Sequence, residues 1–202
     1  MTQETTSKRR TSRRRASDGP NVMSILVGPV GVAALMVVLI GGLWYRDRAS
    51  QVPFEPNTEI GQAALETVET APDLGREHVD RGQPVNYEED FPTSGPHDPN
   101  PVMPGVYVQE QRPEQIVHAL EHGNIVIYRD QPDAETLQTI EAWADQFTGP
   151  WDGVVVVPSP GLGEAVVLTA WTKKLVLPEF KPEAAASFID EYRGRGPENP
   201  VR

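Results

Sequence analysis

The chain has 202 residues, a formal net charge of −11 and no cysteine. The absence of cysteine excludes thiol catalysis, disulfides and thiolate metal ligands. The charge is divided unevenly, since residues 1–48 carry eight basic and three acidic side chains whereas residues 49–202 carry ten basic and 26 acidic ones. Because nucleic-acid binding depends on clustered Lys and Arg, the acidic main body argues against nucleic acid as a partner.

The N-terminal region predicts a membrane anchor. Residues 1–21 are polar and basic, which predicts a disordered cytoplasmic tail. Residues 22–45 carry no charge and match the about 20 apolar residues that cross a bilayer as a helix. More basic residues precede this stretch than follow it, so the positive-inside rule places the N-terminus in the cytoplasm. A cleaved signal peptide is the alternative, although the apolar run is long for one. We therefore expect a single-pass protein of the cell membrane with an extracytoplasmic C-terminal domain.

Two segments without hydrophobic periodicity follow. Residues 46–75 are rich in proline and polar side chains, which predicts a stalk or linker. Residues 76–105 are dominated by turn formers, which predicts a long irregular loop. Because this loop contains two aromatic residues and two histidines, we expect it to be packed onto the domain.

Regular patterning begins at residue 106. The pattern predicts strands at 106–108, 124–128, 153–157 and 165–171, and helices at 113–122, at 133–147 and from Pro182 onward. Pro113 suits the first position of a helix, and Gly123 suits its C-terminal cap. The short linker 158–163 predicts that its two flanking strands pair antiparallel. The order predicts one α/β domain with an α+β tendency at 76–195, built on a three- to four-stranded mixed sheet and about three helices. Residues 196–202 are expected to be a disordered tail.

The four histidines are the main candidates for chemistry. Two of them lie in His118-Ala119-Leu120-Glu121-His122-Gly123, where helical spacing puts both imidazoles on one face. Neutral imidazole is the commonest metal ligand of proteins, and without thiolates the candidate metals are zinc and copper. The predicted ligands are His118, His122, His97 and His78, with Glu121 in support and Met103 as a possible soft ligand for copper.

Two other interpretations of the histidines stay open. They can form a purely structural polar cluster, since His122, next to the cap, is placed to interact with the last carbonyls of the helix. The segment from His118 to His122 also matches the H-x-x-E-H signature of a zinc-peptidase class, in which the glutamate activates water. The early end of the predicted helix argues against that enzyme. The expected function is therefore non-catalytic: metal handling at the cell envelope, or a scaffolding role with an envelope protein partner.

Four segments occur in one order along the chain: Pro92-Thr93-Ser94-Gly95-Pro96-His97, Gly105-Val106-Tyr107, the histidine segment 118–123, and Thr169-Ala170-Trp171. With these segments, the chain resembles the bacterial domain-of-unknown-function 3105 family over about residues 76–195. The resemblance implies anchoring by one N-terminal helix, which is typical of the family. It implies no activity, because the family has no established one to carry over.

Overall fold

The computed structural model describes residues 29–49 and 52–202. The chain divides into two units after Tyr45, and each is described by itself. Helix α2 (Pro29–Ala49) accounts for the described part of the first unit, and its side chains from 32 to 42 are exposed. Within the described ranges, no helix combines the length and the apolar character that crossing a membrane requires.

The predicted transmembrane helix at 22–45 is therefore not supported. The uncharged part of α2 covers residues 29–45. The helix then continues through three charged residues at 46–48. The predicted tail 1–21 and the first part of the predicted span, 22–28, lie outside the described residues.

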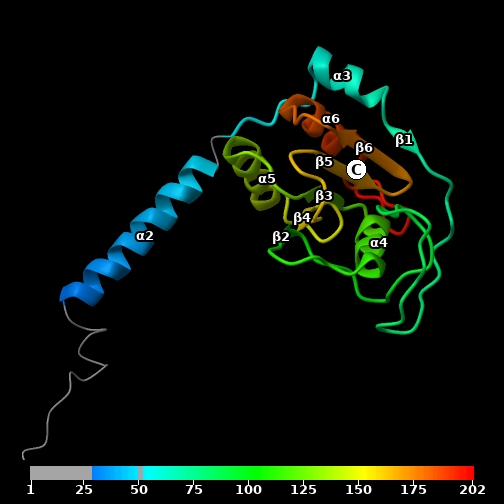
Figure 1. Ribbon diagram of the computed structural model, residues 1–202, viewed down its shortest axis with the longest axis horizontal. Coiled ribbons are helices and arrows are strands. Elements are labelled where there is room, and N and C mark those ends of the chain that lie inside the picture. Colours follow the sequence, from blue (N-terminus) through cyan, green and yellow to red (C-terminus); the bar gives the residue numbers. More distant parts are fainter. Residues whose placement is uncertain (1–28, 50–51) are drawn as a thin grey trace, which may run out of the picture. The chain divides into compact units, whose positions relative to one another are not determined.

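A six-stranded mixed sheet forms the centre of the second unit, with the strand order β1-β6-β5-β3-β4-β2 (Figure 1). The strands are β1 (Glu69–Thr70), β2 (Gly105–Val106), β3 (Ile125–Arg129), β4 (Val154–Pro158), β5 (Val166–Ala170) and β6 (Lys173–Leu177). Strands β3 and β4 are parallel, and helix α5 (Ala134–Gln146) supplies the crossover that a parallel pair requires. Strand β5 pairs antiparallel with both β3 and β6.

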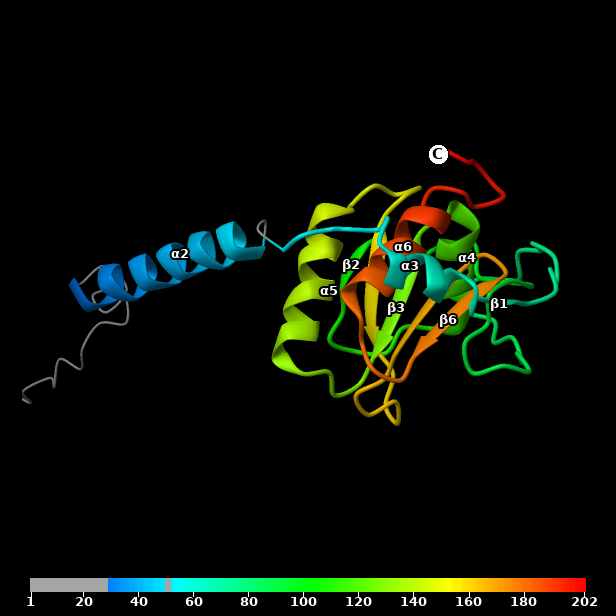
Figure 2. The ribbon, with the colours of Figure 1, turned by 90° about the horizontal axis from the view of Figure 1, so that it is seen from above.

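Helices cover both faces of the sheet (Figure 2). Successive side chains of β3 point to opposite faces of the sheet, as they do in any β-strand. Ile125 and Ile127 join a core cluster with α5 and with α6 (Pro182–Tyr192). Val126 and Tyr128 join a second cluster with α4 (Pro113–His122). The continuous apolar run of β3 is thus buried on both sides, which is typical of a central strand.

The predicted pairing of the strands at 153–157 and 165–171 is wrong. Strand β3 lies between β4 and β5, where its residues Ile125–Tyr128 are buried on both faces of the sheet. Strand β6 is not predicted by the sequence pattern, since it opens with two lysines. Its later residues Leu175 and Leu177 enter the core, so the sheet has more strands than the expected three to four.

Residues 52–75 do not form a stalk. Helix α3 (Glu59–Leu65) packs on α6, and β1 pairs antiparallel with β6. The ammonium group of Lys174 on β6 lies 3.0 Å from the carboxylate of Glu69 on β1, which adds an ion pair to this edge. The folded unit therefore includes segments well before residue 76.

Candidate metal centre

Helix α4 carries three of the candidate residues. It begins with Pro113, where the missing N–H costs no hydrogen bond, and it ends at Gly123, whose φ of 99° is left-handed. The N–H of Gly123 bonds to carbonyls of the last turn. Leu120 packs on the sheet, and the side chains of His118 and Glu121 are buried beside the loop that precedes the helix.

That loop brings the other two histidines together. His78 and His97 form an isolated parallel bridge, in which the N–H of Val79 donates to the carbonyl of His97 at 2.8 Å. The N–H of His97 in turn donates to the carbonyl of Glu77 at 2.9 Å. The centroids of the two imidazole rings are 5.0 Å apart. His97 and its neighbours from Thr93 are buried or half-buried, so this part of the loop is packed onto the domain as expected, whereas most of residues 76–90 are exposed.

All four imidazoles converge. The ring centroid of His118 lies 4.9 Å from those of His78 and His97, and 4.7 Å from that of His122. Ligand atoms of four residues lie within 4.8 Å of one another, and we call this group the inner site: His78, His97, His118 and Glu121. Three of these side chains are buried and His78 is exposed, so the inner site meets solvent through one ligand.

Backbone carbonyls fix the orientation of the two buried imidazoles. Nδ1 of His97 lies 2.8 Å from the carbonyl oxygen of Gly95, and Nδ1 of His118 lies 2.7 Å from that of Asp98. Because a carbonyl oxygen can only accept, both Nδ1 atoms carry a hydrogen. The neutral rings therefore keep the lone pair on Nε2, the nitrogen that is left for a ligand role.

The carboxylate of Glu121 faces the lone pair on Nε2 of His97. Its Oε2 is 3.1 Å from Nε2 of His97, and two lone pairs at that distance repel unless a proton or a cation lies between them. Burial lowers the pKa of His97 and of His118. Burial, followed by the charge of Glu198, raises the pKa of Glu121. Without a cation, a proton must lie between the two atoms, and both pKa directions favour the neutral form of each partner.

These pKa directions predict that the metal-free fold loses stability in acid. Histidine in an unfolded chain takes up a proton near its ordinary pKa of about 6.5, whereas His97 and His118 resist protonation in the fold. The unfolded state therefore binds more protons as the pH falls from about 7.5 to about 5.5. Glu121 opposes this effect, because its pKa is raised in the fold. Each proton that the unfolded state holds in excess of the fold lowers the free energy of unfolding by about 1.4 kcal/mol per pH unit, and this excess is largest well below about pH 6.5, where both unfolded histidines are charged. Urea denaturation in the presence of a chelator measures this free energy.

The substitution Glu121→Gln separates the effect of the two histidines on stability from the opposing effect of Glu121. It removes the opposing proton uptake, so the loss of stability should become steeper and approach about 2.7 kcal/mol per pH unit, the value for two excess protons, well below about pH 6.5. Exposed Glu110→Gln is the matched control and should follow the unsubstituted protein. A free energy of unfolding of the Glu121→Gln variant that stays constant or rises on acidification would contradict neutral buried imidazoles.

His122 belongs to a second group of ligand atoms, which we call the outer site: His118, His122 and Glu198. Nε2 of His122 lies 3.0 Å from Oε2 of Glu198. The ring of His122 stacks on Trp151, with centroids 4.0 Å apart and an angle of 26° between the planes. His122 is half-buried and Glu198 is exposed, so the outer site is more open to solvent than the inner one.

Glu198 is missed by sequence reasoning because residues 196–202 are predicted to be a disordered tail. Within the structure this segment instead runs past the end of α4 (Figure 2). The N–H of Glu198 donates to the carbonyl of Glu121 at 3.3 Å, and that of Gly194 to the carbonyl of Gly123 at 2.8 Å. A Cβ at Gly196 would contact the backbone of Glu121 and Gly123. Two glycines in a polar segment are the signal that could have indicated this close approach.

Asp98 is a second residue that the sequence pattern does not reveal. Its carboxylate accepts hydrogen bonds from Asn100 and from the N–H of Gly82, and these contacts lower its pKa. Arg112 adds an ion pair at 3.0 Å. Because its side chain is held in this way, the carbonyl of Asp98 is in a fixed position from which it orients the ring of His118.

Both histidines of the H-x-x-E-H pattern, His118 and His122, belong to the outer site, whereas its glutamate belongs to the inner one. The peptidase signature requires a glutamate that is left to activate water beside the ion that its histidines hold. Glu121 instead faces His97, with Oε2 3.1 Å from Nε2. The arrangement around α4 therefore does not favour the peptidase interpretation.

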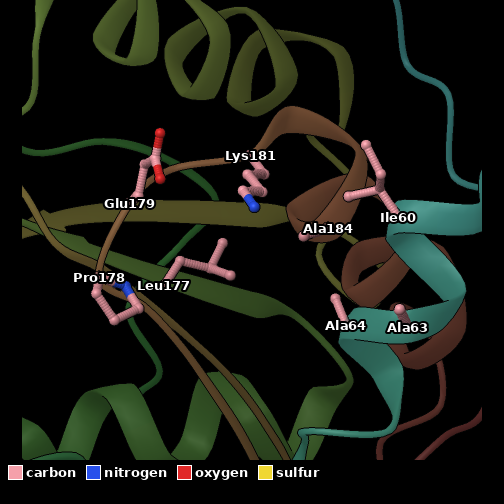
Figure 3. A pocket seen from close by; sticks show the side chains of 8 residues that line it. All are labelled: Ile60, Ala63, Ala64, Leu177, Pro178, Glu179, Lys181 and Ala184. Atoms are coloured by element: carbon pink, nitrogen blue, oxygen red, sulfur yellow. The ribbon is translucent and has the colours of Figure 1, made fainter.

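Two other features need a place beside the imidazole groups. Met103 is half exposed, its carbonyl accepts a hydrogen bond from the hydroxyl of Tyr107 at 2.9 Å, and its sulfur as a copper ligand stays a prediction. A groove of about 560 Å³ lies between α3, α6 and the end of β6 (Figure 3). It is lined by apolar residues such as Ile60 and Leu177 and contains no histidine. Metal-binding chemistry is therefore concentrated at the inner and outer sites.

The fold and the cluster define a small α/β domain with helices on both faces of a mixed sheet and a buried imidazole–carboxylate group. A family model described as "Protein of unknown function (DUF3105)" matches residues 78–202, a range that includes all four histidines, Glu121 and Glu198. The chain belongs to this family, which confirms the resemblance drawn from the sequence motifs. No curated protein and no solved structure matches the chain.

Proposed function

We propose that the protein binds one divalent transition-metal ion, zinc or copper, at the inner site, and that it does so without catalysing a reaction. The observation that carries this proposal is the hydrogen bonding of His97 and His118. Each donates Nδ1–H to a backbone carbonyl and keeps the lone pair of Nε2 for the cluster. Metal-ligating histidines almost always use their second nitrogen in this way, because the bond fixes the tautomer and the ring orientation.

The distances at the inner site suit a small ion. Ligand atoms at about 2.0–2.1 Å from a tetrahedral zinc ion lie about 3.3 Å from one another. Nε2 of His97 and Oε2 of Glu121 are 3.1 Å apart, and the whole group lies within 4.8 Å. A cation would also take the place of the proton that separates these two atoms.

The donor set favours borderline metals and a closed site. Three imidazole nitrogens and one carboxylate oxygen suit zinc and copper, whereas calcium and magnesium prefer oxygen ligands alone. Catalytic zinc sites typically use three protein ligands and leave one position for water, whereas structural sites fill all four. Four protein ligands at the inner site, three of them buried, therefore support binding without catalysis.

Metal titration of the full-length protein tests the proposal. After treatment with a chelator, the chain should bind one zinc or one copper(II) ion, as measured by calorimetry and by elemental analysis after gel filtration. His78→Ala removes the exposed ligand with little effect on the core, and it should weaken binding by at least about 10–100-fold, the range seen for outer-shell losses.

The adjacent exposed residue supplies the control. Glu77→Ala leaves its backbone carbonyl in place and should retain the affinity of the unsubstituted protein. A folded chain that retains neither metal would overturn the proposal, and so would equal affinities of the two variants.

A further inference from the structure

The inner and outer sites share a single residue, His118. Its Nδ1 donates to the carbonyl of Asp98 at 2.7 Å, which leaves Nε2 as the nitrogen that can bind a cation. Nε2 has one lone pair and binds one ion at a time. Because both sites need this nitrogen, an ion at one of them excludes an ion bound through His118 at the other.

The two sites differ in the number and the accessibility of their ligands. The inner site offers four ligands, of which three are buried, whereas the outer site offers three, including the exposed carboxylate of Glu198. More ligands favour the inner site at equilibrium, and greater exposure makes the outer site easier to reach from water. Two ions at about 2.0–2.1 Å from the same nitrogen lie at most about 4 Å apart, so an ion can pass between the sites in one short step.

The C-terminal segment holds Glu198 in position for this step. Arg76 donates to the carbonyl of Pro197 at 3.1 Å, and its Nε lies 3.9 Å from Oε1 of Glu121. The N–H of Glu198 donates to the carbonyl of Glu121. The segment that carries Glu198 is thus held to Glu121 through one guanidinium group and one backbone hydrogen bond. Stacking on Trp151 holds the ring of His122 beside them.

We propose that the outer site is the entry and exit position of the metal ion, which reaches the inner site by exchanging ligands while it stays bound to Nε2 of His118. The proposal rests on the proposed function, since it requires an inner site that binds metal. In the step, the bonds of the ion to His122 and Glu198 break, and bonds to His78, His97 and Glu121 form. The proton between Glu121 and His97 leaves to solvent.

Stopped-flow absorption with cobalt(II) and the full-length, metal-free protein tests the step. His122→Ala and Glu198→Gln should leave one cobalt bound per chain, with an affinity close to that of the unsubstituted protein. Both variants should slow loading by about tenfold. Because the affinity is kept, release to an added chelator should slow by the same factor, whereas simple loosening of the structure would speed release. Exposed Glu110→Gln is the matched control for the glutamate variant.

The outcomes separate the two proposals. Slower loading and slower release in Glu198→Gln, whose exposed side chain can be replaced with little effect on the core, support the entry position. Rates equal to those of the control overturn it and leave metal binding at the inner site intact. An unsubstituted protein that binds no cobalt overturns both.

Discussion

His118→Ala should lower the affinity of the protein for zinc more than any other single histidine substitution, by more than about 100-fold. His118 is the residue common to the inner and outer sites, so its loss takes a ligand from both. Its ring lies within 5 Å, centroid to centroid, of the other three imidazoles. Competition with a chromophoric zinc chelator measures the affinity over this range.

His122→Ala is the matched control, because it removes the same chemical group from the same helix but leaves the four inner ligands in place. Its equilibrium affinity should stay close to that of the unsubstituted protein. His118→Gln, which fills more of the space left by the ring, guards against loss of affinity through a cavity, and circular dichroism confirms folding. Equal affinities of the His118 and His122 variants would contradict the assignment of the inner site.

Gly123→Ala should destabilise the fold by about 4 kcal/mol, a loss that is exceptional for one substitution. Two effects add. The φ of 99° is left-handed, which costs an L-residue with a side chain about 1–2 kcal/mol. An added Cβ would also lie 2.7 Å from the backbone nitrogen of Gly196 and 2.9 Å from the carbonyl oxygen of Trp151. Neither atom belongs to a side chain that can rotate away. Urea denaturation gives the free energy of unfolding.

Gly161→Ala separates the two effects. Gly161 has nearly the same φ, 100°, but no heavy atom within 4 Å of an added Cβ. This variant should therefore lose only the backbone cost of about 1–2 kcal/mol. If the two variants are equally stable, the C-terminal segment does not press against the end of α4.

Local signals were sufficient to predict several elements from the sequence. The helix at 113–122 matches α4, since a proline at its start and a glycine after its end act within the helix itself. The buried strands β3, β4 and β5 lie within one residue of their predicted positions, because each is a short apolar run. The order of the strands was not predictable in this way. Pairing depends on contacts distant in sequence, and the short linker 158–163 favoured a hairpin that the central position of β3 prevents.

The same distinction between local and distant contacts applies to the residues of the site. His118 and His122 could be placed on one face of a helix from spacing alone, whereas the approach of His78 depends on a bridge to His97 within an irregular loop. Glu198 could not be predicted, because no periodicity marks the segment that carries it. The location of the protein in the cell membrane stays a prediction.

The inner ligands and α4 are synthesised before the strands on which that helix packs. While the chain emerges from the ribosome, Leu120 has no apolar surface to cover until β3, β4 and β5 have followed, and Glu198 arrives later still. Contacts of this kind form slowly, since long loops must close first. The imidazoles of a nascent chain are therefore solvated and unorganised, and binding of metal in the final geometry reports that β3, β4 and β5 have been made and that α4 has docked on them. A ribosome-stalled chain that stops before β5 should lack the site.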